Sequence, residues 1–478
     1  MSRNKFVKII TLFLASLMLV ACQMQNFGKI KTDFSQLKKV PASILNKGTN
    51  FYSSKNEDED NDGVALDTPL PLNDILGGSL ATKNRGTDFI SSIKYALDTD
   101  PEIVSRQREI EAKLAATAIA EAQKDFEVEA TVYGGIEDVT DNTKGLAVAL
   151  NASRLVFDGG KLDAQIASSV FELEASEMYL AATVDQRTNK LLQIWLDLEK
   201  YKSLQAQIDK RLSVLDPLID QLEKVAEAGI GDVSKVTAAQ RTVSAIRVEK
   251  TNVEQGLAQA QLEFTNALGV LNNGIEFDYD LITNLVPSEI DDSLVQSSPL
   301  LKSHYATYRS GLARVQALRA KGGFDIGFQA KAMRPFAGSG YDSDESIGLV
   351  GKKTLFNGSM LDSEIKEAEA LSDLSLAQIK ATYRVGASAV DAALQNVVSM
   401  EKAILIAREN AKLTADEIIY LRQQLIIGGS TLDSVLSAEA RLYEAESKEI
   451  KLLTEKYKSQ ILIASSLGLL SSALGYQN

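Results

Sequence analysis

The 478-residue sequence has few of the side chains that usually carry chemistry, with only one cysteine and one histidine. A single cysteine cannot form an internal disulfide, and one histidine, His304, is too few for a metal triad or a zinc site. No serine elbow is present, no pair of acids is singled out by spacing, and Gly348–Thr354 lacks the four-residue spacing of a phosphate-binding loop. We therefore expect no enzyme, no metal site and no cofactor other than a covalent lipid.

Positive charge is also in short supply. The chain has 51 Lys and Arg against 64 Asp and Glu, which gives a formal net charge of −13. An acidic chain repels phosphate backbones, so we expect no nucleic-acid partner. After the first 21 residues no run of about 18 apolar residues occurs, so the sequence predicts no transmembrane helix there.

The N-terminus has the pattern of a secretory signal. Met1–Ala21 has a basic start, an apolar stretch and a small-residue end. The segment ends in Leu19-Val20-Ala21-Cys22, which looks like a bacterial lipobox. We expect Cys22 to become the acylated first residue of the mature chain, anchored because each buried methylene contributes about 0.8 kcal/mol. The alternative is a thiol lost with a signal that is cleaved elsewhere. Gln23 follows, as in lipoproteins that are passed on to the outer membrane.

Residues 22–88 form a polar N-terminal tail, which we expect to be extended along the rest of the chain or partly disordered. Within it, Asp58–Gly63 matches the first half of a calcium-binding helix-loop-helix loop. The twelfth position of such a loop should be a bidentate Glu and is Pro69. We interpret these acids as a solvated charge run.

Most of the remaining chain occurs twice. The sequence LVFDGGKLDAQI around Phe157 returns as TLFNGSMLDSEI around Phe356, at an offset of 356 − 157 = 199 residues. The same offset relates Gly229 to Gly428. Because the offset holds over a long stretch, both copies should have the same helix lengths and turn positions.

Each copy contains a long stretch in which mostly apolar residues recur every seven positions. In the first copy the column is Leu191, Leu198, Gln205, Leu212 and Ile219, and in the second it is Val390, Val397, Ile404, Ala411, Ile418 and Leu425. A repeat of seven is typical of helices in coiled-coil packing. Paired glycines near 229 and near 428 predict tight turns between two helices. By itself, the pattern also fits a soluble helical bundle or a dimeric coiled coil.

In two segments the helical period is replaced by alternating apolar and polar residues. Residues 126–157 and 324–356 each predict a β-hairpin, the second with a return strand over Ile347–Phe356. Strands of about ten residues match the ~9–11 residues that cross a bilayer on a tilt, with one face apolar. Half-exposed hairpins of soluble proteins look the same. Four strands cannot close a barrel, but three chains would supply 3 × 4 = 12.

The sequence thus predicts a mostly α-helical chain with a small β part. Repeat 1 covers 89–272, a connector covers 273–298, and repeat 2 covers 299–478. Each repeat is expected to hold a helix, a β-hairpin and a long helical hairpin.

These features together resemble the TolC-like outer membrane efflux protein family. The resemblance rests on the tandem halves, the LVFDGG and TLFNGS junctions, DVSKVTAAQR (232–241) and LDSVLSAEAR (432–441) after the glycine tips, and the closing Ser-Leu-Gly (466–468). The lipobox resembles the lipidated branch of that family. The resemblance implies a homotrimer whose 12-stranded outer-membrane β-barrel continues into a periplasmic α-helical barrel. It also implies docking to a periplasmic adaptor protein that serves an inner-membrane pump or ABC transporter.

The resemblance also implies two sets of site residues. The adaptor contacts lie at the helical tips, Gly229, Ile230, Gly231, Gly428 and Gly429, which equally suit plain turns. The family often closes its periplasmic end with a ring of aspartates just past the second tip. In this chain Ser434 and Ser437 occupy those places. The remaining candidates for a cation-binding gate are Asp232, Asp433 and Glu439, with simple solvated or capping acids as the alternative.

Two functions follow for the chain. The first is a passive outer-membrane channel, the exit duct of a tripartite efflux or type I secretion system, whose energy comes from its partner. The alternative is a structural periplasmic coiled-coil lipoprotein without a pore. A channel requires outward apolar positions on the strands at 126–157 and 324–356, whereas a coiled coil does not need these hairpins.

Overall fold

The structure is a computed structural model that describes residues 88–138, 143–228, 233–269, 275–287, 289–338, 342–427 and 429–475. All of these residues belong to one of the two compact units of the chain, Asn73–Gln477. The predicted signal segment, Cys22, the acidic run at Asp58–Gly63 and the tail up to residue 87 lie outside the described residues.

The described chain contains helices and one small set of strands. In order they are α4 (Phe89–Asp98), α5 (Pro101–Ala122), β1 (Glu127–Asp138), β2 (Thr143–Phe157), α6 (Lys161–Glu227), α7 (Val233–Leu268), α8 (Tyr279–Leu285), α9 (Asp292–Gln296), α10 (Pro299–Ala320), β3 (Asp325–Gly338), β4 (Asp344–Lys352), α11 (Met360–Ile426), α12 (Leu432–Leu467) and α13 (Leu469–Ala473). The prediction of a mostly helical chain with four strands is confirmed.

The two copies of the repeat have helices of equal length. Helices α5 and α10 each have 22 residues, α6 and α11 each have 67, and α7 and α12 each have 36. At 1.5 Å per residue, the longest helices measure roughly 100 Å. This equality is the expected consequence of the constant sequence offset.

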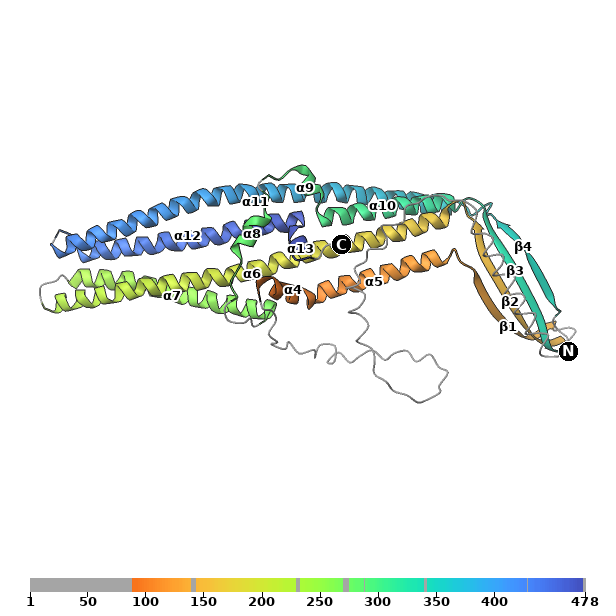
Figure 1. The fold of residues 1–478 in the computed structure, drawn as a ribbon, viewed down its shortest axis with the longest axis horizontal. Coiled ribbons are helices and arrows are strands. Elements are labelled where there is room, and N and C mark those ends of the chain that lie inside the picture. The colour runs from red at the N-terminus through yellow and green to blue at the C-terminus, as the bar shows by residue number, and fades with distance from the viewer. Residues whose placement is uncertain are drawn as a thin grey trace. The chain divides into compact units, whose positions relative to one another are not determined.

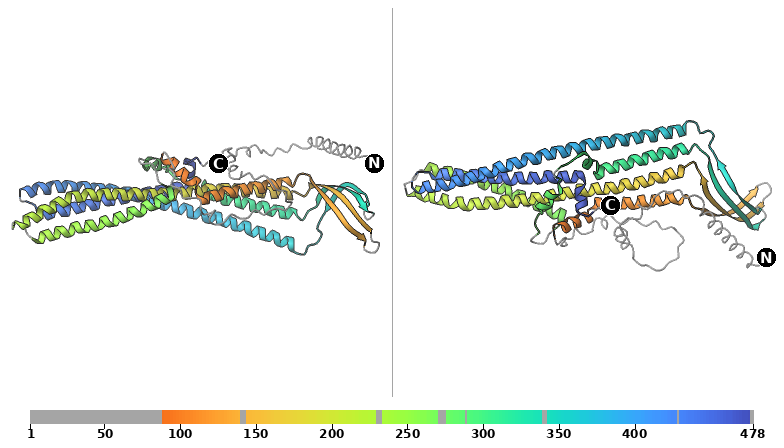
Figure 2. Two further views of the ribbon diagram at one scale, coloured as in Figure 1. Left: turned by 90° about the horizontal axis from the view of Figure 1, so that it is seen from below. Right: turned by 45° about the horizontal axis from the view of Figure 1, so that its top comes forward.

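Each long helix is accompanied by two shorter ones. Figure 1 shows α5 and α10 beside the halves of α6 and α11 nearer the sheet, while α7 and α12 lie beside the halves farther from it. Figure 2 shows the same arrangement from two other sides, with the strands at one end of the helices. Helix α12 also contacts α6, which joins the two copies.

The predicted seven-residue columns lie along the buried side of the long helices. Leu198, Leu212 and Ile219 of the column in α6 are buried, and Leu191 and Gln205 are partly buried. In α11, Val390, Ile404 and Ile418 are buried, and the other members of the column are partly buried. The seven-residue repeat therefore identifies buried and partly buried positions in both long helices.

The largest core lies where α4, α6, α7 and α8 meet. Its centre is Trp195 of α6, which is almost fully buried. The Phe264 ring packs edge-on against Trp195 at a centroid distance of 5.3 Å, and Phe89 and Phe277 complete the aromatic group. Edge-to-face pairs at such distances are favourable beyond their area burial. This core fixes the short helices of the connector against the first repeat.

The four strands form one antiparallel sheet in the order β1-β2-β3-β4, so the two hairpins join through β2 and β3. The sequence prediction that the last strand ends at Phe356 is wrong, because β4 ends at Lys352. Lys352 pairs with Asp325, the first residue of β3, so later residues have no neighbouring strand to pair with.

The strand β3 continues to Gly338 and includes a proline, Pro335. The register shifts beside the proline, since Ala147 pairs with Pro335 and Leu146 pairs with Ala337. A bulge accommodates a residue that has no N–H to donate to the sheet.

The strand-to-helix junction is capped by Asp158, although not as an N-cap residue. The N-cap of α6 is Gly160, which has a left-handed φ of +86°. The Asp158 carboxylate accepts hydrogen bonds from the N–H groups of Gly160 (2.9 Å) and Leu162 (2.6 Å). These bonds satisfy donors that would otherwise have no partner at the start of the helix.

Gly468, at the end of α12, packs closely against the start of the second repeat. It ends α12 with a left-handed φ of +76°. A Cβ added at this position would lie 2.2 Å from Cδ of Pro299, the first residue of α10. No other residue type fits both the backbone conformation and the space.

We predict that Gly468→Ala destabilises the protein by about 2–5 kcal/mol, because backbone strain of ~1–2 kcal/mol adds to overpacking of ~1–3 kcal/mol. Gly160→Ala is the matched control, since its φ is also left-handed but no atom lies within 4 Å of the added Cβ. Denaturant unfolding of both variants checks the difference, and equal losses of stability would contradict it.

Candidate functional site

The sheet has one apolar and one polar face. Val128 pairs with Ala152, Ala152 with Ala330, and Ala330 with Ile347, so one row of apolar residues crosses all four strands. Ile347 is 73% exposed and Val128 is 67% exposed. Neighbouring rows on the same face add Val132, Leu150 and Leu349, which are also exposed. Within the described chain, nothing covers this apolar face.

The next row of the sheet is polar. Glu129 pairs with Asn151, Asn151 with Lys331, and Lys331 with Ser346. Because successive residues of a strand point to opposite faces, this row lies on the other side of the sheet from Ile347. The alternation of apolar and polar faces is the pattern of a strand that separates hydrocarbon from water.

Both edges of the sheet are open in the described chain. The outer strands β1 and β4 each have a single neighbour. An edge strand presents a row of unpaired N–H and C=O groups, and such groups cannot remain unpaired in hydrocarbon. The sheet therefore needs further strands if its apolar face meets lipid. Among the described residues, no helix is both long enough and apolar enough to span a lipid bilayer.

The far ends of the long helices hold the predicted tips. Gly229, Ile230, Gly231, Asp232 and Gly428 lie outside the described residues. Gly429 is exposed, and its N–H donates a hydrogen bond to the carbonyl oxygen of Gln424 (2.8 Å), which closes the end of α11.

The first two turns of α12 hold three of the predicted gate residues, Asp433, Ser434 and Ser437. Thr431 is the N-cap of this helix, and its hydroxyl lies 2.8 Å from the hydroxyl of Ser434. Asp433 and Ser437 are exposed. Asp433 is the acid of the first turn, where a negative charge interacts favourably with the helix dipole.

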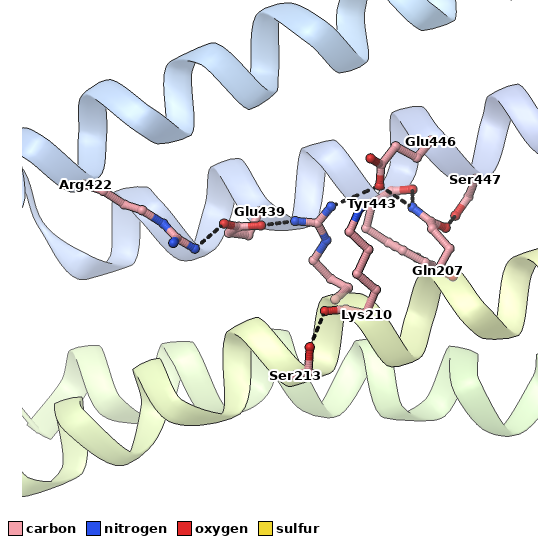
Figure 3. Close-up of polar contacts among 9 residues, drawn as sticks. Gln207, Lys210, Ser213, Arg422, Glu439, Tyr443, Glu446 and Ser447 are labelled. Carbon is pink, nitrogen blue, oxygen red and sulfur yellow. Dashed lines mark hydrogen bonds and ion pairs between the residues drawn. The ribbon is translucent and has the colours of Figure 1, made fainter.

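Glu439, the last predicted gate residue, is in a different environment. It is 2% exposed and lies between α6, α11 and α12. One of its oxygens is paired with Arg211 of α6, and the other accepts a hydrogen bond from Arg422 of α11 at 2.8 Å (Figure 3). The carboxylate thus joins all three helices, and its charge is compensated by two arginines.

The cluster extends from Arg211 along α12. Arg211 also donates to Glu446 at 3.0 Å, and Glu446 accepts from Gln207 at 2.8 Å. The Gln207 side chain in turn accepts a hydrogen bond from Ser447 (2.7 Å), as Figure 3 shows. Two charges buried at this depth require such partners, because each loses its hydration.

Sequence reasoning identified Glu439 as a gate candidate and missed its partner. A signal was present, since Arg211 is three residues after Ile208 and four before Leu215, both buried. An arginine on the apolar side of a helix predicts a buried acid on a neighbour. That acid is 228 residues away in sequence, and local spacing cannot find it.

A second buried acid, Asp185 of α6, holds the C-terminal helix. It is 1% exposed. Its carboxylate accepts hydrogen bonds from the N–H (2.7 Å) and the hydroxyl (3.0 Å) of Ser471 in α13. Burial raises the pKa of Asp185 to about 7, and the bonds from Ser471 oppose this rise.

Other chemistry is sparse in the described part of the chain. His304 of α10 is half-buried, and burial lowers its pKa. In the same part of the chain, no group of three or more His, Cys, Asp or Glu residues could hold a metal ion.

The fold is similar to that of solved outer-membrane channels. The structure of CusC, described in terms of transmembrane channel formation, gives a TM-score of 0.68 at 15% identity over 81% of this chain and 94% of CusC. The outer membrane protein VceC of Vibrio cholerae gives 0.67 at 16% identity over 79% of this chain and 95% of VceC. The outer membrane channel CmeC of Campylobacter jejuni gives 0.65 at 12% identity over 89% and 97%.

No protein-family profile matches the sequence, and no curated protein does either. The likeness is therefore one of fold. It confirms the expected fold of the single chain, mostly helical with one four-stranded sheet, and all three of these structures are of membrane proteins.

We predict that Glu439→Ala destabilises the protein by about 3–5 kcal/mol, because Arg211 would remain buried with only the partly exposed Glu446 as an acidic partner. Glu369→Ala is the control: Glu369 pairs with Arg319, and both side chains are largely exposed, so its loss should cost less than about 1 kcal/mol. Denaturant unfolding checks both variants. Equal effects would show that the buried cluster contributes no more than a surface ion pair.

We also predict a pH effect from Asp185. Its pKa in the folded protein, about 7, is above the ordinary value of 3.8, so the folded state keeps a proton that the unfolded state loses. Stability from this group is therefore present below pH 4 and is lost as the pH rises towards 7. Asp185→Asn keeps the hydrogen bonds to Ser471 but cannot ionise.

The melting temperatures at pH 5 and pH 8 measure this effect. The wild type should lose more stability between these values than Asp185→Asn does. Parallel pH profiles for the two proteins would rule out a raised pKa at this position.

Proposed function

We propose that this chain is an outer-membrane channel, the exit duct of an efflux or type I secretion system. The proposal is carried by the sheet, with exposed Val128 and Ile347 on one face and Glu129 and Lys331 on the other. The likeness in fold to outer membrane channels supports it. In this role the protein is a passive conduit and not an enzyme.

The proposed assembly is a homotrimer. Three sheets with open edges at β1 and β4 would supply 3 × 4 = 12 strands and close a barrel without free edges. The helices provide a second reason, since Ile406, Leu413 and Tyr420 of α11 recur every seven residues and are 68%, 61% and 66% exposed. A regular apolar seam of this kind needs another helix beside it.

The alternative, a structural periplasmic coiled-coil lipoprotein, accounts for the long helices but not for the sheet. Burying each exposed apolar side chain of Val or Ile size is worth roughly 1.5–3 kcal/mol. A protein that remains in water gains nothing from leaving Val128, Val132, Ile347 and Leu349 uncovered on one face of the sheet. The sheet is therefore better explained by contact with lipid.

The anchor and the partner are further parts of the proposal. An acyl chain on Cys22 would hold the mature N-terminus in the outer membrane. A periplasmic adaptor, serving an inner-membrane pump or ABC transporter, would contact the tips at Gly229, Ile230, Gly231, Gly428 and Gly429.

The gate is proposed to lie near the same end of the helices. Of its candidates, Asp433 and Ser437 are exposed, with Ser434 next to the N-cap, and Asp232 belongs to the same end by its place in the sequence. Glu439 already interacts with two arginines. Asp433 is therefore the better candidate for a ring of acids that attracts cations.

The purified mature protein should form discrete conductance steps in planar bilayers, and native mass spectrometry should give three chains per particle. Two variants of β4 test the sheet. Ile347→Lys places a charge on the apolar face, at a cost of ~2–4 kcal/mol near the middle of a bilayer, and should impair insertion. Ser346→Lys places the same charge on the opposite face and should change only conductance or ion selectivity.

A monomer without conductance would refute the channel, and equal insertion of the two lysine variants would refute the assigned faces. Cys22→Ala tests the anchor separately. This variant should conduct in planar bilayers but be depleted from cell membranes, and unchanged membrane retention would show that the lipid is dispensable.

A further inference from the structure

A ring of aromatic and basic side chains lies on the apolar face, at the end of the sheet next to the helices. We call it the collar. It consists of Phe126, Arg154, Phe157, Phe324, Phe328 and Lys353.

The register places these residues on the same face as Ile347. Arg154 pairs with Phe328 and Phe328 with Leu349, two residues along each strand from the apolar row. Phe157 pairs with Ile326 in the next row. Phe324 directly precedes β3 and Lys353 directly follows β4, so both lie next to the terminal pair of Asp325 and Lys352.

The cations of the collar rest on its rings. The guanidinium carbon of Arg154 lies 5.1 Å from the centroid of Phe126, and Nζ of Lys353 lies 4.9 Å from that of Phe324. Phe126 packs edge-on against Phe328 at 6.0 Å. These contacts hold both positive groups at the border of the apolar surface.

Neither cation of the collar is neutralised by an acid. Arg154 donates from Nε to the carbonyl oxygen of Lys124 at 3.1 Å, and within the described residues no carboxylate forms an ion pair with Arg154 or Lys353. Both side chains are exposed. In a chain with a net charge of −13, these two cations without acidic partners form a local positive surface that can attract an anion.

Two cations of the sheet lie farther from the helices and differ in this respect. Arg334 is paired with Glu345, and Lys331 is paired with Asp344 at 3.0 Å. Among the side chains that the structure describes, the uncompensated positive charge of the sheet is therefore concentrated at the helix end.

We propose that the collar binds the headgroups of anionic phospholipids in the leaflet nearest the helices. The phosphate would accept hydrogen bonds from Arg154 and Lys353, the glycerol region would lie against the phenylalanines, and the acyl chains would cover the row from Val128 to Ile347. This inference rests on the proposed function, because it requires the apolar face to meet lipid.

The chemistry fits a phospholipid headgroup for two reasons. An arginine or lysine near the membrane surface attracts anionic lipid, and aromatic side chains favour the border between hydrocarbon and water. The collar combines both beside an apolar band, so it defines the level at which the protein sits in the bilayer.

The experiment measures lipid binding to the intact mature protein by native mass spectrometry. Detergent-purified protein is titrated with dioleoylphosphatidylglycerol or with dioleoylphosphatidylcholine. We expect phosphatidylglycerol to bind more tightly to the wild type, and the double variant Arg154→Gln/Lys353→Gln to lose this preference, by roughly fivefold in affinity for each cation removed. High salt should reduce the preference in the wild type.

Arg334→Gln/Lys331→Gln is the matched control, because it removes the same charge from the rest of the sheet and should keep the preference. Arg154→Lys/Lys353→Arg keeps the charge at the collar and should also keep it. If the neutral collar variant does not fold, the wild type alone still decides, since equal binding of the two lipids would overturn the proposal.

An unchanged preference in the folded collar variant would overturn it as well. Failure of the proposed function looks different, because the protein would then not insert into vesicles of either phospholipid. Insertion into vesicles of both phospholipids without a preference would overturn only the proposal that the collar binds anionic lipid.

Discussion

The structure depends on the hydrogen bonding of a sheet that one chain cannot complete. The outer strands β1 and β4 each have one neighbour, and the face that carries Val128 and Ile347 is apolar and uncovered. In hydrocarbon, an unpaired backbone N–H or C=O group costs several kcal/mol. Pairing of these edges is the reason for proposing a trimer, and the exposed apolar residues that recur along α11 are the second reason.

Charge is distributed differently in the helices and in the sheet. Among the helices, buried Arg211 and Glu439 pair with each other, Arg211 also pairs with Glu446, and Glu439 also pairs with Arg422, so two cations meet two carboxylates. In the sheet, Arg334 and Lys331 have acidic partners while Arg154 and Lys353 do not. The buried group stabilises contacts between helices, whereas the unpaired group faces outward. A negative chain can therefore still present a local positive surface to a membrane.

The sequence predicted the helices well because their information is local and is repeated. The offset between Phe157 and Phe356 implies equal helix lengths, and the seven-residue columns contain residues such as Leu212 and Ile404 that prove to be buried. Prediction failed where the structure of a residue depends on partners that are distant in the sequence. The end of β4 depends on where β3 begins, and the environment of Glu439 depends on an arginine from the other repeat. The environment of Asp185, held by Ser471, is equally invisible to local spacing.

The two halves of the chain are equal in their helices but not in their strands. Strand β2 has 15 residues, while its counterpart β4 has 9. In a ring of three chains, the helical part would present six nearly equivalent hairpins and so approach sixfold symmetry. The strand region would alternate tall and short segments and keep strict threefold symmetry. Any molecule passing along the axis would therefore meet a smooth hexagonal section at one end and a notched triangular rim at the other.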